Sequence, residues 1–179
     1  IHIRNYRGFE DLTVELNPQF NLVIGDNGAG KTSFIVACIR LLQPYIDELT
    51  VSLTDVLKVR RFHEYEIRIK TIDGQPRFQF PVKLEANGIV NNRTFNCFLK
   101  VESRAGIIEY SLDNIEDIAN KMIVDSRNGD KVVFPLLSRY GAKRVWIQDA
   151  DTEYFKQIEG VETGYKDCLS DYSRSEERR

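Results

Sequence analysis

The sequence predicts an α/β fold in which a glycine-rich loop joins a buried strand to a helix, next to a separate antiparallel region. Residues 25–32 fit the pattern G-x-x-x-x-G-K-[ST] of the phosphate-binding loop. The apolar run 20–24 before it is typical of a buried strand, and the run 33–42 after it has helical spacing. From about residue 53 to 112, polar and apolar residues alternate between turns, which indicates antiparallel strands with one solvated face.

Composition limits the class of protein. The 179 residues suffice for one domain or one large lobe, and 42% hydrophobic with 29% charged residues is ordinary for a globular protein. A net charge of -2 excludes a global basic field for nucleic acid. A local basic patch is open at Lys58, Arg60, Arg61 and His63, although a solvated strand edge is the simpler interpretation.

The cysteine pattern and the hydropathy indicate the cellular compartment and the absence of a membrane span. Cys38, Cys97 and Cys168 are odd in number and widely spaced, so they form neither a disulfide framework nor a metal motif. This usage suits a reducing compartment, and we expect a cytoplasmic protein. No apolar run approaches the ~20 residues that span a bilayer, so no membrane partner is expected.

The N-terminal segments lead into the loop. Residues 1–6 alternate as a half-buried strand does, and 12–16 alternate again, so the two are predicted to pair as a hairpin. Asn17 and Pro18 interrupt the chain before the predicted strand at 20–24.

The loop residues have the chemistry that a polyphosphate requires. Glycines let the main chain approach a phosphate closely, and successive N–H groups converge on it at the positive end of the following helix. Lys31 is expected to reach the β- and γ-phosphates and Thr32 to ligate Mg²⁺. The sequence therefore predicts a site for ATP with Mg²⁺.

The remaining elements follow from periodicity and turn signals. Pro44 is expected to end or kink the first helix, and Asp73-Gly74 is a hairpin turn. A helix is predicted from Asp113-Asn114 to about Asp125. The further predicted strands lie at 65–70, 77–84, 94–101, 107–110 and 132–137, with a turn at 86–88, a loop at 138–144 and a truncated helix at 173–179.

Two segments resemble known families. Residues 4–9, the hairpin partner and 21–33, with the N-G-x-G-K-T form of the loop, resemble the start of RecF/SMC-type ABC ATPase heads. The segment 134–144 resembles the P-[VL]-x-x-Y-Y-G-x-x-R segment of PtuA-like ATPases, which belong to Septu and retron anti-phage defence systems.

The resemblance implies a P-loop NTPase fold of ABC-ATPase-head type, with a mixed core sheet around one P-loop helix and an antiparallel β lobe. It divides the chain into N-terminal strands, loop and first helix (1–50), the β lobe, a helix and a return strand toward the Q-loop (51–144), and the start of a helical or coiled-coil arm (145–179). The signature and Walker B motifs of such heads are absent, since 122–125 and 145–149 match Walker B poorly. The sequence thus resembles the N-terminal part of a longer ATPase.

The resemblance also implies roles for individual residues. Lys31 is the expected catalytic residue, Thr32 the metal ligand, and hydrolysis is expected to be incomplete in this segment. Tyr140-Gly141 stands where a Q-loop glutamine is expected, with Gln148 nearby, and Arg139 and Arg144 are candidates for the nucleotide or the dimer interface. The expected nucleotide-binding residues are Gly25, Asn27, Gly28, Ala29, Gly30, Lys31, Thr32, Ser33, Arg4 and Tyr6, with Arg7 and Asp26 as further candidates.

Three functions remain open at this point. The first is an ATPase head that dimerises, or forms a higher oligomer, on ATP and regulates a partner effector nuclease of HNH type in defence. The second is a RecF/SMC-like ATPase of DNA repair or chromosome organisation, with DNA or RNA on the dimer. The third is a small P-loop kinase, against which the long antiparallel stretch 53–112 argues.

Overall fold

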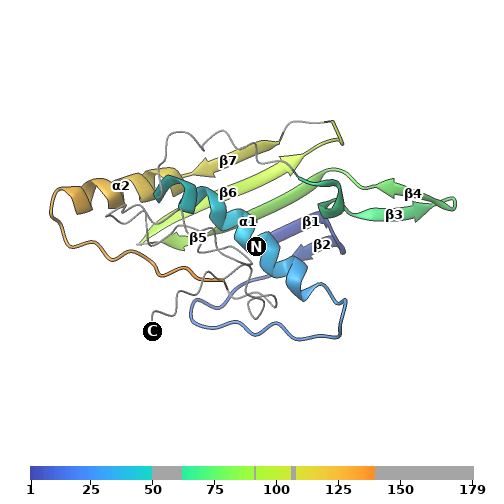
Figure 1. The fold of residues 1–179 in the computed structure, drawn as a ribbon, viewed down its shortest axis with the longest axis horizontal. Helices are drawn as coiled ribbons and strands as arrows, with labels where there is room; N and C mark the ends of the chain where they lie inside the picture. Colours follow the sequence, from blue (N-terminus) through green and yellow to red (C-terminus); the bar gives the residue numbers. More distant parts are fainter. Residues whose placement is uncertain (50–61, 91, 106–107, 140–179) are drawn as a thin grey trace, which may run out of the picture.

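The computed structural model describes residues 1–49, 62–90, 92–105 and 108–139 (Figure 1). The predicted arm at 145–179 and the segment 140–144 lie outside these residues. The elements are β1 (His2–Tyr6), β2 (Phe9–Thr13), α1 (Lys31–Leu49), a 3-10 helix (Glu64–Glu66), β3 (Ile69–Ile72), β4 (Gln75–Phe78), β5 (Val82–Val90), β6 (Arg93–Val101), β7 (Glu109–Asp113) and α2 (Ile115–Arg127).

One five-stranded sheet organises the described residues. Its strand order is β2-β1-β5-β6-β7, and every pairing is antiparallel. Helix α1 crosses one face of this sheet and α2 packs against α1, while the β3–β4 hairpin projects from one end (Figure 1). The antiparallel pairing predicted for the strands after residue 53 agrees with the structure, but β1 and β2 lie in the same sheet as β5–β7 and not in a sheet of their own.

Strict alternation along β5 and β6 creates the core. Val82 and Leu84 of β5 lie opposite Val101 and Leu99 of β6, and all four side chains are buried. The face is closed by α1, which contributes Phe34, Ala37 and Leu41 to the same cluster. A second cluster joins the C-terminal half of α1 to α2. Because that half is held by packing, α1 continues through Pro44, where the sequence predicted an end or a kink, and runs to Leu49.

Two turn predictions had different outcomes. Asp73 and Gly74 both have left-handed φ values, of 52° and 73°, and form the predicted hairpin turn between β3 and β4. The turn predicted at 86–88 was wrong, because β5 runs on to Val90. Gly88 pairs with Phe95 there, and a methyl group on Gly88 would lie 3.0 Å from that aromatic ring. Cross-strand packing overrides the local turn signal.

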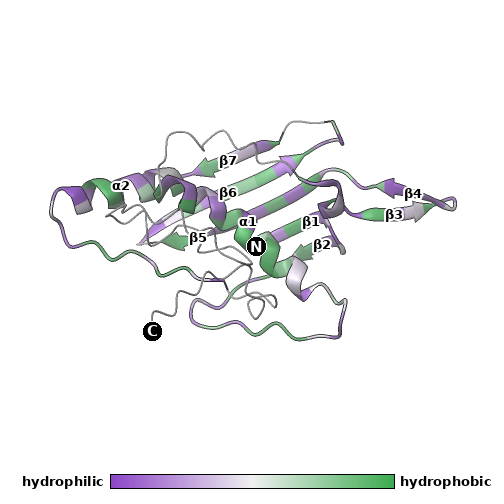
Figure 2. Ribbon diagram, in the orientation of Figure 1, coloured by the Kyte–Doolittle hydropathy of each residue, from purple (hydrophilic) through white to green (hydrophobic). Residues whose placement is uncertain are grey.

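The strand predicted at 20–24 is not formed among the described residues. This segment has no regular secondary structure and no partner strand, with Leu22 72% and Ile24 80% exposed. The same holds for the predicted strand at 132–137, where Leu136 is 95% exposed. Apolar residues recur along both segments (Figure 2). A strand needs neighbours to satisfy its backbone, and no described residue supplies them, so the expected mixed core sheet is not seen.

The helix predicted from 113 is confirmed as α2, with Asn114 at its N-cap position. In the described ranges, no helix has the length and apolar character needed to cross a membrane.

Candidate phosphate-binding site

Residues 25–30 form a turn that directly precedes α1, as the sequence predicted. Gly28 and Gly30 have φ values of 86° and 92°, in the left-handed region that glycine adopts without strain. The Ala29 amide donates to the Asp26 carbonyl at 3.1 Å, and the Phe34 amide donates to the Gly30 carbonyl at 2.9 Å, which begins the helix. The helical hydrogen bonding of α1 thus starts at the Gly30 carbonyl.

Lys31 closes the loop on itself. It is the first residue of α1, and its Nζ donates to the carbonyl oxygens of Gly25 and Asp26, each at 2.7 Å. The first turn of α1 contains no acidic side chain. The positive helix end and the ammonium group therefore act together with no carboxylate from that turn opposing them, which favours an anion at this position.

The residues around the loop are accessible to a ligand. Residues 25–29 and Thr32 are exposed, whereas Gly30, Lys31 and Ser33 are half-buried. Thr32 lies in the first turn of α1, so its hydroxyl belongs to the same helix end as the amides. A hydroxyl beside phosphate oxygens fits Mg²⁺, which binds few protein ligands and keeps several waters. The donor set present therefore fits a magnesium–phosphate group.

An aromatic side chain of β2 packs against the loop. A methyl group on Gly30 would lie 2.9 Å from Cζ and 3.2 Å from Cε1 of Phe9, so the Phe9 ring lies directly against this glycine. Sequence reasoning did not single out Phe9, because the contact joins β2 to the loop across twenty-one residues. The only available signal was the aromatic residue directly after the Arg7-Gly8 turn.

The N-terminal strand residues lie in different environments. Arg4 is exposed on β1, while Tyr6 is fully buried and its hydroxyl donates to Glu66 Oε1 at 2.9 Å. The Cζ atom of the Arg7 guanidinium lies 5.5 Å from the centroid of the Tyr6 ring and 5.7 Å from that of the Tyr65 ring. The structure thus brings Tyr6 and Arg7 together around Glu66, and their roles at a nucleotide stay predictions.

The other candidates are scattered. Asp26 and Asn27 are exposed in the loop, and Arg139 is half-buried. Arg144 and the Q-loop candidates at 140–141 and 148 fall beyond the described part of the chain.

A buried carboxylate that the sequence did not reveal links α1 to β1. Glu66 is 1% exposed and accepts hydrogen bonds from Arg40 Nε at 3.1 Å, from Arg40 Nη2, and from the His63 backbone amide at 3.0 Å. Burial, with the Glu66 carboxylate beside the ring, raises the pKa of the Tyr6 hydroxyl above its usual range. Glu66 thus contacts both Arg40 of α1, the helix that carries Lys31, and Tyr6 of β1.

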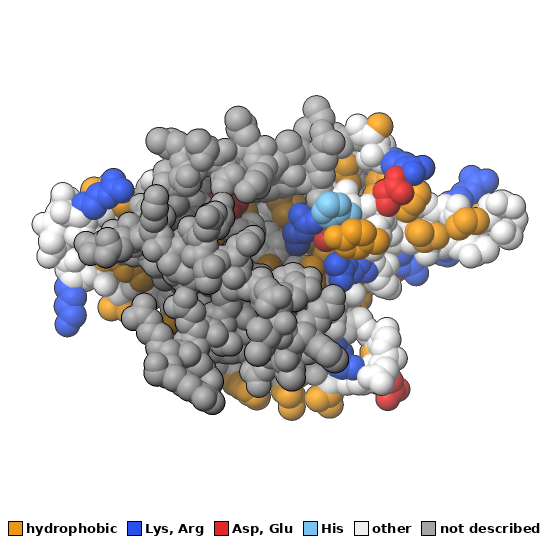
Figure 3. Space-filling view, in the orientation of Figure 1, with side chains coloured by type: hydrophobic (Ala, Val, Ile, Leu, Met, Phe, Trp, Pro, Cys, Tyr) orange, Lys and Arg blue, Asp and Glu red, His pale blue; other side chains and the backbone are white. Residues whose placement is uncertain are grey.

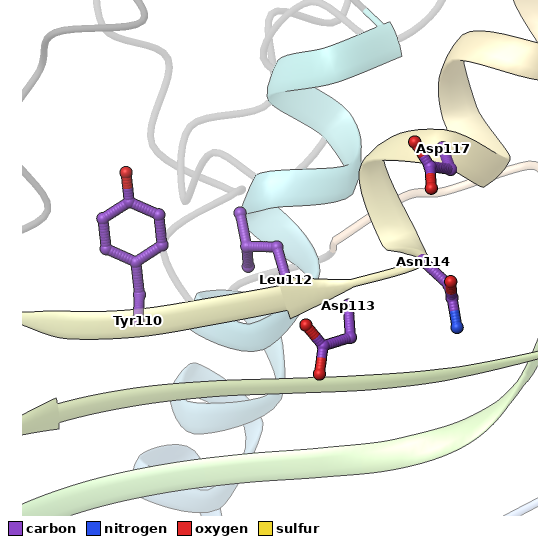
Figure 4. A pocket seen from close by; sticks show the side chains of 5 residues that line it. All are labelled: Tyr110, Leu112, Asp113, Asn114 and Asp117. Carbon is purple, nitrogen blue, oxygen red and sulfur yellow. The ribbon is translucent and has the colours of Figure 1, made fainter.

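The hollows of the surface lie elsewhere. One open hollow is lined by residues of β7 and the start of α2: Tyr110, Leu112, Asp113, Asn114 and Asp117 (Figure 4). Its side chains do not converge, because Tyr110 and Leu112 project from one side of β7 and Asp113 from the other (Figure 4). Within the described ranges, no group of three or more histidine, cysteine or acidic side chains is arranged to hold a metal.

Comparison with known proteins gives one family and several relatives. A family model described as "AAA domain" matches residues 1–178. The chain is 49% identical over 35 residues to the DNA replication and repair protein RecF of Actinobacillus pleuropneumoniae serotype 5b, which is 20% of this chain and 10% of that protein. RecF of Limosilactobacillus reuteri is 43% identical over 37 residues (21% and 10%), and RecF of Haemophilus ducreyi is 46% identical over 35 residues (20% and 10%). The matched segment thus spans about a tenth of the length of these curated relatives.

Proposed function

The chain belongs to the AAA domain family, and from that membership we propose that it binds and hydrolyses ATP as an ATPase head of the RecF/SMC-like ABC class. The observation that carries this proposal is the loop itself. Two left-handed glycines directly precede the N-terminus of α1, and the Lys31 ammonium at that helix end is held against the loop carbonyls. Such an arrangement binds a polyphosphate.

Within this proposal the described residues supply binding and charge neutralisation. The loop amides and Lys31 would hold the β- and γ-phosphates, and Thr32 would contribute a ligand to Mg²⁺, which neutralises the charge that develops in phosphoryl transfer. Gly25, Asn27, Gly28, Ala29, Gly30 and Ser33 would surround the phosphates.

We also propose that this chain is the N-terminal part of a longer ATPase. The apolar segment 20–24 is exposed, and in 132–137 the side chains of Val133 and Leu136 are exposed while the others are half-buried. Exposed apolar side chains of this kind favour an interface. The relatives support this proposal, because a match of 35 residues that is 10% of RecF corresponds to a protein of about 350 residues, against 179 here. The residue that positions the attacking water would then lie in the remainder of the protein.

The ATPase head would act as a dimer, or a higher oligomer, that closes when ATP binds between two heads. A second head would add contacts to the γ-phosphate that exist only in the closed state, so ATP would shift the population toward closure. The closed state would then regulate a partner.

Two partners fit this scheme. A role in DNA replication or repair is favoured by the names of the relatives. The basic side chains gathered over the end that carries the β3–β4 hairpin also favour it (Figure 3). Lys70 of β3 and Arg77 of β4 are exposed there, while Arg68 and Arg104 are paired with Glu10 and Glu64. ATP-dependent DNA binding that weakens steeply with salt would support this role.

The second partner is an effector nuclease of HNH type in anti-phage defence. It is supported by the likeness of 134–144 to PtuA-like ATPases, of which residues 134–139 are described. Loss of phage protection in a Lys31→Ala variant would support this role, and unchanged protection would overturn it.

The substitution Lys31→Ala tests the shared premise of ATP binding. We expect the affinity for Mg²⁺ and a nonhydrolysable ATP analogue to fall by about 100-fold or more, since a charge-assisted contact at the phosphate is lost. Lys70→Ala, an exposed lysine on β3, is the matched control and should bind as the wild type does. Flat calorimetric titrations with the wild-type protein would refute the proposed function.

A further inference from the structure

We propose that Phe9 is a positioning residue for the phosphate loop, whose ring holds Gly30 in the conformation that receives a phosphate. This inference rests on the proposed function, because it concerns the affinity of the same loop for a triphosphate. Phe9 itself lies below the loop and does not contact the ligand in this proposal.

The contact falls where the loop becomes helix. Gly30 has φ +92°, and its carbonyl accepts the amide of Phe34 at 2.9 Å. The next residue is Lys31, the first residue of α1. A Cβ atom on Gly30 would lie 2.9 Å from Phe9 Cζ, a distance that real Cβ atoms essentially never show. The Phe9 ring therefore occupies the space next to Gly30, and a shift of the loop toward Phe9 would require the ring to move.

Phe9 is itself anchored on a rigid element. It begins β2 and pairs with Tyr6 of β1, which is fully buried. The turn between them is tight, with Arg7 at φ +49° followed by Gly8. The Phe9 side chain also packs against the main core cluster. A support is effective when its own conformation is fixed by packing, which is the case here.

The loop needs such a support because it has few other contacts. Residues 25–29 are exposed, and the described hydrogen bonds within the loop are those of Ala29 and Lys31. The two carbonyl contacts of Lys31 use two of the three donors of its ammonium group, so they hold the side chain in place and leave one donor for a phosphate. Packing against Phe9 persists when the ligand is bound, and it preserves the arrangement of the amides. Preorganised groups bind more tightly because less ordering is needed on binding.

The test compares Phe9→Ala and Phe9→Leu with Leu12→Ala in the full-length protein. Leu12 is the matched control, because it lies on the same strand, is half-buried and packs against the same core. Phe9→Leu keeps the apolar volume but removes the ring, so it remains informative if Phe9→Ala folds poorly. Two readouts are needed: calorimetric affinity for Mg²⁺ with a nonhydrolysable ATP analogue, and amide hydrogen exchange without nucleotide.

We expect both Phe9 variants to lose about tenfold in affinity, as is typical when a group that supports a binding residue is removed. Amides 26–34 should exchange faster in these variants, while those of the β3–β4 hairpin should not change. Leu12→Ala should affect neither readout beyond its effect on the melting temperature.

Two outcomes would overturn the inference, and they differ. If the wild-type protein binds the analogue, and the Phe9 variants match it in both affinity and loop hydrogen exchange, the inference alone is overturned. A wild-type protein that binds no triphosphate would overturn the proposed function together with it.

Discussion

Replacing Glu66 by glutamine removes a buried charge while keeping the size of the side chain. Glu66 is 1% exposed and accepts hydrogen bonds from the Tyr6 hydroxyl, two nitrogens of Arg40 and the His63 amide. The glutamine amide retains one acceptor oxygen but turns an NH₂ group toward donors. Hydrogen bonds to charged groups contribute about 1.5–3 kcal/mol each, and removing one partner of a buried pair costs about 3–5 kcal/mol.

The Arg40 side chain remains 23% exposed, so water can compensate part of this loss. We therefore expect Glu66→Gln to lower the free energy of unfolding by about 2–3 kcal/mol, a large share of the 5–15 kcal/mol typical of a domain. Tyr6→Phe, which removes one donor, should cost about 1–2 kcal/mol. Urea unfolding followed by far-UV circular dichroism measures both values.

Glu64→Gln provides the matched control on the same 3-10 helix. Glu64 pairs with Arg104, but both side chains are about 60% exposed, at 59% and 62%. Exposed ion pairs contribute little, so the control should change stability by less than about 0.5 kcal/mol. Equal losses for the Glu66 and Glu64 variants, or a Glu66→Gln variant as stable as the wild type, would refute the view that Glu66 holds α1 to β1.

Two further predictions concern alkaline pH and the β3–β4 turn. Burial raises the folded-state pKa of Tyr6 above its unfolded value near 10, so its stabilisation is complete below about pH 10 and is lost as the pH rises further. Tyr6→Phe should flatten this alkaline decline in melting temperature. The control Tyr65→Phe, at an exposed tyrosine, should leave the decline as it is in the wild type. Gly74→Ala should destabilise by about 1 kcal/mol, because φ +73° is strained for alanine. Gly8→Ala meets no atom within 4 Å and should cost less in the same thermal unfolding assay.

The sequence predicted the local features of this molecule well. The loop pattern places Lys31 at a helix start, and Asp73-Gly74 places a hairpin turn, because both depend on residues adjacent in the chain. The predicted strand at 94–101 also agrees with β6.

Features that depend on distant residues were missed. Asn87-Gly88 has a turn composition, yet pairing with β6 keeps it in a strand. Glu66 resembles any solvated acidic residue in the sequence, and its burial follows from Arg40, twenty-six residues away. The apolar character of 20–24 correctly predicts a preference for burial, but periodicity alone does not supply the neighbouring strands.

The bond between the Lys31 ammonium and two carbonyls of its own loop has a consequence for the thermodynamics of ligand arrival. The ammonium has three N–H donors, and the Gly25 and Asp26 carbonyls accept two of them, so an arriving phosphate takes the third from a cation that is already held in place. Binding therefore adds an acceptor without requiring that the two contacts to the carbonyls break. The lysine side chain is ordered before the ligand arrives, so less conformational entropy is lost on binding, and selectivity for a triphosphate depends on the amides as much as on the charge.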